Sequence, residues 1–146
     1  MTSTNNKYAD MSRDYMARAE DYLGQGDLVQ ASEKCWGAAA CVLKAIAERR
    51  AWRHQSHSLL YDISSQIADE QSRPELRDMF VEANSMHQNF YEDWMPEEVV
   101  ERVVGRVKAY LAELDAVGLE LPASFLVESR AQRRRLERLT GQSMPL

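Results

Sequence analysis

Three histidines, His54, His57 and His87, lie in the middle third of the sequence. An imidazole changes its charge near neutral pH, so it can transfer protons, bind a transition metal, or donate and accept hydrogen bonds. His54 and His57 are three residues apart, and a third imidazole from a neighbouring helix would complete a metal site. Histidines that are hydrated or hydrogen-bonded without a metal are more common, and no Glu-x-x-His pair is present. We therefore predict no metal and no cofactor.

Two arginine–histidine pairs have a spacing suited to phosphodiester cleavage. Four residues separate Arg49 from His54, and six separate Arg50 from His57. In such a pair the imidazole moves a proton to or from the ribose hydroxyl, and the guanidinium stabilises the charge that develops on the phosphate. Because arginine makes up 14 of the 146 residues, this spacing also arises readily by chance. Arg50, His57 and His87 are the candidate catalytic residues on this interpretation.

Further polar side chains lie close to these histidines in the sequence. Arg53 and His54 precede His57, whereas Asn84 and Tyr91 flank His87 on a later helix. If the two stretches meet in the fold, the imidazoles and Asn84 supply hydrogen bonds and Arg53 favours phosphate. We predict that Arg53, His54, Asn84 and Tyr91 bind a ligand at this polar junction.

The most basic segment is Arg130–Arg138, which contains five arginines and one glutamate. Such a segment can contact nucleic acid through phosphates. However, no aromatic residue is interleaved with the arginines to stack on bases. We favour the simpler interpretation, a solvated terminal helix that offsets an acidic chain.

The spacing of apolar residues predicts helices and no strands. Apolar residues recur three and four apart between the breakers, which are Gly24–Asp27, Ser72–Pro74, Pro96 and the pair Gly118 and Pro122. The helices are expected at about residues 8–23, 28–50, 57–71, 75–92, 96–118 and 123–139. We predict an all-α, up-and-down bundle of about five helices in residues 1–118, with an arginine-rich C-terminal helix in residues 119–146 that packs on it or extends from it.

The composition is that of a folded protein, with 45% hydrophobic and 28% charged residues. The net charge of −5 argues against a global attraction to nucleic acid and leaves a local basic patch open. No stretch is long and apolar enough to span a membrane, and the polar N-terminus does not look like a secretory signal. We therefore expect a cytoplasmic protein with no membrane contact, in which Cys35 and Cys41 are reduced and buried.

Several short motifs follow one another in a characteristic order. They are Gly26-Asp27, QASEKCWGAA at residues 30–39, Trp52, Ser56-His57 and HQNFYE at residues 87–92. Together they resemble the HEPN superfamily of helical domains, most closely its PaREP-type branch, over about residues 8–115. The resemblance implies a compact helical bundle that forms a homodimer. Many members of the superfamily are metal-independent ribonucleases, often the toxins of toxin–antitoxin pairs, and others are binding or scaffolding modules.

The resemblance also suggests where nuclease residues would lie. In the nuclease members a histidine on a late helix follows an arginine at short spacing and is paired across the dimer. This chain has His87 at the histidine position and Glu82 at or near the arginine position, and Arg77 lies ten residues before His87. A carboxylate would repel the scissile phosphate. We therefore favour binding of a nucleotide, RNA or protein partner, and leave a ribonuclease or a purely structural interaction module as alternatives.

Overall fold

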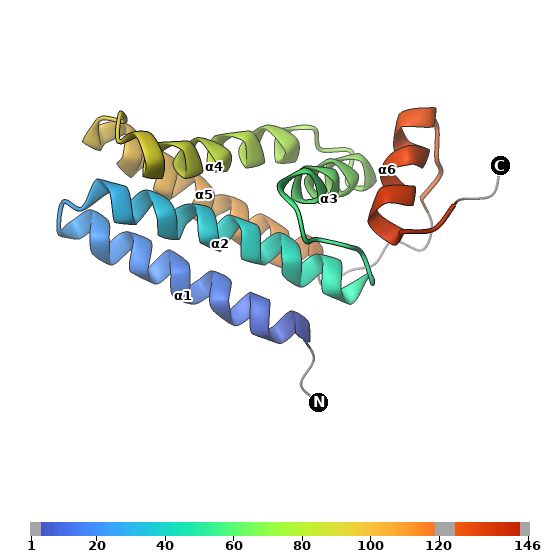
Figure 1. Cartoon of the computed structure of the whole chain (residues 1–146), viewed down its shortest axis with the longest axis horizontal. Helices are drawn as coiled ribbons and strands as arrows, with labels where there is room; N and C mark the ends of the chain where they lie inside the picture. Colours follow the sequence, from blue (N-terminus) through green and yellow to red (C-terminus); the bar gives the residue numbers. More distant parts are fainter. Residues whose placement is uncertain (1–3, 119–124, 144–146) are drawn as a thin grey trace.

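The computed structural model describes residues 4–118 and 125–143, and these residues form six α-helices and no strand. The helices are α1 (Thr4–Gly24), α2 (Leu28–Arg49), α3 (His57–Glu70), α4 (Glu75–Glu92), α5 (Glu97–Gly118) and α6 (Arg130–Thr140). Figure 1 shows α1, α2, α4 and α5 running along the molecule, with α3 and α6 packed at one end. The all-α class and the helical bundle with a short C-terminal helix are confirmed.

The helix α2 lies at the centre of the bundle and contacts α1, α3, α4 and α5. Small side chains let the neighbouring helices approach it closely, and Ala38 and Ala39 are fully buried. At Gly37 an added Cβ would lie only 3.1 Å from the Tyr15 ring of α1. The small residues of this segment are therefore a packing requirement of the α1–α2 contact.

Both cysteines lie on α2, are buried, and form no disulfide. Burial raises the pKa of the Cys35 thiol to about 12, and it also raises the pKa of Cys41, partly offset by the charge of Lys44. A thiol with a raised pKa is a poor nucleophile. The expected role of both residues as small, buried thiols is confirmed.

A buried amide fixes the connection between α4 and α5. The Asn89 side chain is fully buried, and its Oδ1 accepts hydrogen bonds from the backbone N–H groups of Trp94 (2.9 Å) and Met95 (2.8 Å). Its Nδ2 donates to Ser32 Oγ on α2 at 2.9 Å. The turn itself needs a left-handed residue, Asp93, with φ of 46°. Asn89 therefore ties the C-terminal end of α4 to both α2 and the next connection.

The C-terminal helix α6 packs on α3 through polar contacts. Arg135, only 8% exposed, donates to Gln66 Oε1 at 3.0 Å and to Asp69 Oδ2, and Arg138 makes a bidentate ion pair with Asp62 at 2.8 and 2.9 Å. Burial raises the pKa of Asp69, but the hydrogen bond and charge of Arg135, together with further hydrogen bonds, outweigh burial and lower it. Part of the basic segment is therefore engaged in the fold and not simply solvated.

The sixth helix begins at Arg130 and not near residue 123, because Ser129 is its N-cap and accepts a hydrogen bond from Gln132 N at 3.1 Å. Residues 119–124 lie outside the described residues, so the expected segment boundary between residues 118 and 119 stays a prediction.

In the part of the chain that the structure describes, no helix is long and apolar enough to cross a bilayer. The cytoplasmic location stays a prediction.

We predict that Asn89→Ala lowers the free energy of unfolding by about 2–4 kcal/mol, because it removes three hydrogen bonds and leaves buried backbone N–H groups unsatisfied. Urea unfolding followed by circular dichroism measures the change. Gln88→Ala, an exposed position on the same helix, is the matched control and should change stability by less than about 0.5 kcal/mol. Equal stability of the two variants would contradict the role assigned to Asn89.

Candidate functional site

Five side chains from three helices meet on one surface of the bundle, and we call them the aromatic–imidazole cluster. They are Trp36 on α2, His57 on α3, and Asn84, His87 and Tyr91 on α4. The ring centroids of His57 and His87 lie 5.2 Å apart. The two polar stretches that were expected to form a junction therefore do meet, whereas the function of this junction stays a prediction.

The His57 ring is held by two side chains and by the start of its helix. Ser56 caps α3, with its Oγ accepting a hydrogen bond from Leu59 N at 3.1 Å. The His57 ring stacks on Trp36, with 4.8 Å between centroids and 19° between planes, and Nε2 lies 2.7 Å from Asn84 Oδ1. Because a carboxamide oxygen only accepts, Nε2–H is the donor. The Nδ1 atom of the neutral ring is then left as an acceptor.

His87 lies one turn beyond Asn84 on α4 and is half-buried. Its ring contacts those of Trp36 (5.2 Å between centroids), His57 and Tyr91. Burial lowers the pKa of His87, and the neighbouring His57 imidazole lowers it further. The His87 ring is therefore neutral at neutral pH and carries a nitrogen lone pair, which can accept a hydrogen bond or a proton.

Two further aromatic rings pack against the cluster. Phe80 is fully buried on α4, Tyr61 is half-buried on α3, and the Phe80 ring lies 5.5 Å from Trp36 and 4.8 Å from Tyr61. Tyr61 in turn lies 6.1 Å from His57 on the same helix. Since these rings pack in or against the core, they limit how far Trp36 and His57 can move.

The cluster is open to solvent on the α4 side. The Tyr91 side chain is 72% exposed and meets His87 edge-on, with 5.3 Å between centroids. His57 is also exposed, whereas Trp36 is half-buried. The accessible part of the cluster is therefore formed by the rings of His57 and Tyr91, with His87 between them.

The two arginines expected at this junction point elsewhere. The Arg50 side chain is 7% exposed and is held by an ion pair with Glu70 and by stacking on Trp52, with the guanidinium 4.7 Å from the ring centroid. Arg53 Nη1 donates to the backbone oxygen of Arg138 on α6 at 3.3 Å. Neither guanidinium is directed to the cluster, because each has found a partner on α3 or α6.

His54, which was expected to bind a ligand at the same junction, lies apart from His57. Its ring is buried, with Nε2 3.0 Å from Glu48 Oε1 and the Tyr8 ring edge-on at 5.4 Å. The reason is local: residues 51–56 are not helical, so the helical spacing that would place His54 and His57 on one face does not apply.

Glu82, at the position where the resemblance places an arginine, forms an ion pair with α5. Arg106 donates from Nε and Nη2 to the two carboxylate oxygens of Glu82 at 2.5 and 2.7 Å. The carboxylate is therefore neutralised by Arg106 and links α4 to α5. This arrangement gives Glu82 a structural partner and supplies no cation to His87.

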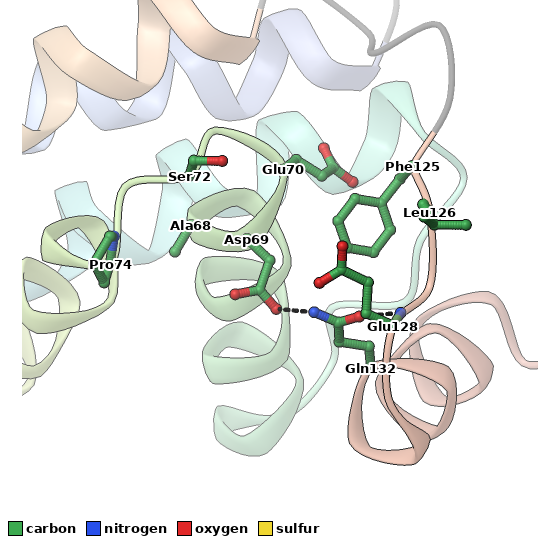
Figure 2. A pocket seen from close by; sticks show the side chains of 9 residues that line it. All are labelled: Ala68, Asp69, Glu70, Ser72, Pro74, Phe125, Leu126, Glu128 and Gln132. Atoms are coloured by element: carbon green, nitrogen blue, oxygen red, sulfur yellow. Dashed lines mark hydrogen bonds between the residues drawn. The ribbon is translucent and has the colours of Figure 1, made fainter.

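Within residues 4–118 and 125–143, no group of three or more His, Cys, Asp or Glu side chains is arranged to hold a metal ion. A cavity of about 600 Å³ lies between α3 and the segment leading into α6, where Figure 2 shows Gln132 pointing towards Asp69, with 3.2 Å between Nε2 and Oδ2. The cavity is lined by the carboxylates of Asp69, Glu70 and Glu128 and by no lysine or arginine of the described residues, so it offers no cationic side chain to an anionic ligand.

The family model of the archaeal PaREP1/PaREP8 family matches residues 7–111. The chain belongs to this family. No curated protein and no solved structure matches it. The match contains every residue of the aromatic–imidazole cluster, and α6 of this PaREP1/PaREP8 protein lies beyond it. The PaREP-type resemblance is confirmed, and the link to the HEPN superfamily stays a prediction.

Trp36 was not among the site residues predicted for this PaREP1/PaREP8 protein. In the structure it packs on Phe80 and carries the stacked ring of His57. Helical spacing on α2 predicts which side Trp36 faces. It could not show that the first residue of α3 would lie on its ring, because that depends on the path of the non-helical segment before α3.

We predict that His57→Gln raises the pKa of His87 towards 6.5, because it removes the neighbouring charge and part of the burial. NMR titration of the His87 ring measures the change, with His54→Gln as the control that should leave the pKa of His87 unchanged. A His87 pKa unaffected by His57→Gln would contradict the coupling.

In the unaltered protein, the free energy of unfolding should decrease as the pH falls from 6.5 towards the lowered pKa of His87, since the unfolded chain binds the proton first.

Proposed function

We propose that this PaREP1/PaREP8 protein binds single-stranded RNA, with bases stacking on the aromatic–imidazole cluster. The observation that carries the proposal is the exposed His57 ring, stacked on Trp36 at 4.8 Å, with His87 between it and the exposed Tyr91 ring. These rings offer flat surfaces. Because they are held in place by packing on Phe80 and Tyr61, they lose little conformational entropy when a ligand binds. Such surfaces suit the faces of unpaired bases, which stack on Tyr, Trp and His side chains.

The hydrogen-bonding groups of the cluster also suit a ribonucleotide. His57 Nδ1 and the neutral His87 ring offer acceptors next to the stacking surface, and the Asn84 amide lies beside them. These groups can pair with the edges of a base or with a ribose 2′-hydroxyl, which distinguishes RNA from DNA. The site therefore combines stacking with a few hydrogen bonds, and this combination is typical of single-strand recognition.

The resemblance to the HEPN superfamily supports RNA as the ligand, since many of its members act on RNA. The same resemblance is the basis for proposing a homodimer. Sedimentation equilibrium of the purified chain measures its oligomeric state directly.

We predict that Tyr91→Ala weakens binding of a fluorescein-labelled single-stranded RNA decamer by about 5- to 150-fold. This follows from the roughly 1–3 kcal/mol that stacking contributes per base. Fluorescence anisotropy measures the affinity, and a DNA decamer of the same sequence should bind more weakly. Trp94→Ala removes a 53% exposed aromatic ring outside the cluster and is the matched control. Equal affinities of both variants and the unaltered protein would overturn the proposal, as would no RNA binding at all.

A metal-independent ribonuclease is the second candidate function. It is favoured by the contact between two imidazoles, His57 and His87, one of which has a lowered pKa and can act as a general base. However, Arg50 is held by Glu70, and Glu82 occupies the expected arginine position. Neither Arg50 nor Arg53, the two arginines expected at this junction, is directed to the cluster. Binding without cleavage therefore agrees better with the geometry.

We predict that a labelled RNA stays intact when incubated with the purified protein in the presence of a chelator, as judged on a denaturing gel. Decay that is abolished by His57→Ala and by His87→Ala, and retained by His54→Ala, would instead establish the ribonuclease. Decay that survives all three substitutions would indicate a contaminant, which repurification of the His57→Ala protein removes.

A further inference from the structure

The C-terminal helix concentrates positive charge in an acidic protein. Five arginines and one glutamate lie in α6, whereas the whole chain has a net charge of −5. Arg135 and Arg138 use their guanidinium groups to hold α6 on α3. The side chains of Arg130 and Arg134 are exposed, and no hydrogen bond or ion pair is recorded for Arg134 among the described residues. The outer face of α6 thus carries charge that the fold does not use.

A basic side chain from outside α6, that of Arg53, lies next to this face. Arg53 lies in the connection between α2 and α3, and its backbone N–H donates to Leu139 O at 2.6 Å while its Nη1 donates to Arg138 O at 3.3 Å. Arg53 and Arg134 both line an open groove of about 530 Å³ together with Arg138, Glu137 and Gly141. The hydrogen bonds to the last turn of α6 therefore fix the connection against the helix and form one wall of the groove.

The groove lies a short distance along the chain from the aromatic–imidazole cluster. His57 is the fourth residue after Arg53, so their Cα atoms are at most about 14 Å apart. Gln55 and Ser56, which lie between them, are exposed. A single strand could therefore follow this connection, with a base at His57 and phosphates at the groove.

We propose that the groove between Arg53 and the C-terminal half of α6 binds the phosphates of the RNA strand whose bases stack on the aromatic–imidazole cluster. This rests on the proposed function and supplies phosphate contacts near the cluster, to which neither Arg50 nor Arg53 is directed. The groove lies near the C-terminal end of α6, where the helix dipole is negative. The anion must therefore be held by the guanidinium groups and not by backbone N–H groups, so binding depends on side-chain charge.

The test compares Arg53→Gln/Arg134→Gln with Arg13→Gln/Arg102→Gln, which removes two exposed arginines from α1 and α5. Affinity for the RNA decamer is measured at several salt concentrations. Each lost phosphate contact lowers the slope of log affinity against log salt by about 0.7 for a single strand. The groove variant should therefore lose about 1.4 from the slope and bind about tenfold more weakly at low salt, whereas the control variant should change little.

Further measurements separate charge from folding. Arg53→Lys/Arg134→Lys keeps the charge and should retain the slope, and circular dichroism should show an unaltered helix content in all three double variants. The nucleoside adenosine, which has no phosphate, should bind the groove variant as it binds the unaltered protein.

The outcomes distinguish the two proposals. RNA binding that is weakened by Tyr91→Ala but has the same slope and affinity in the groove and control variants would overturn the groove and leave the cluster intact. The absence of any RNA binding by the unaltered protein would overturn the proposed function, and the groove inference with it. A weakened groove variant that the lysine replacement does not rescue would show a packing effect and would also overturn the inference.

Discussion

The packing of the His57 ring between α2 and α4 is the contact on which the site depends. His57 stacks on Trp36 and donates a hydrogen bond to Asn84, so one side chain at the start of α3 joins three helices. This contact holds the start of α3 against α2 and α4. His87 lies against the same two rings and is half-buried, and burial together with the His57 imidazole lowers its pKa. Packing, hydrogen bonding and proton affinity are therefore coupled in one small cluster.

Several arginines form ion pairs that join two elements of the fold. Arg50 pairs with Glu70, Arg106 with Glu82 and Arg138 with Asp62. Each of these ion pairs links two elements of the bundle. Charge that is not used in this way lies on the outer face of α6 and at Arg53. Separation of a stacking surface from a basic surface matches a ligand that is itself divided into bases and phosphates.

Helix positions were predictable from the sequence because the breakers and caps act locally. Asp27 and Pro74 lie where α2 and α4 begin, and the spacing of Val100, Val103 and Val107 predicted α5 despite the preference of valine for strands. The start of α6 was misplaced, since Ser129 caps the helix and the pattern before it resembled a helical one. Local signals therefore predict that a helix is present more reliably than they predict the residue at which it begins.

The site was predictable only in part, because it depends on contacts between distant residues. The junction of His57 with Asn84, His87 and Tyr91 was expected from polar residues gathered in two stretches. The positions of Arg50, Arg53 and His54 were not, since each is decided by a partner that sequence spacing does not reveal: Glu70, the last turn of α6, and Glu48. The stacking role of Trp36 was missed for the same reason.

The central claim is that RNA bases lie against the rings of His57 and His87. NMR spectra of the three histidine rings, recorded with and without saturating single-stranded RNA, test it within one sample, because the buried His54 ring serves as an internal control. We expect the ring signals of His57 and His87 to shift while those of His54 do not. Unchanged signals of His57 and His87 in the presence of bound RNA would contradict it.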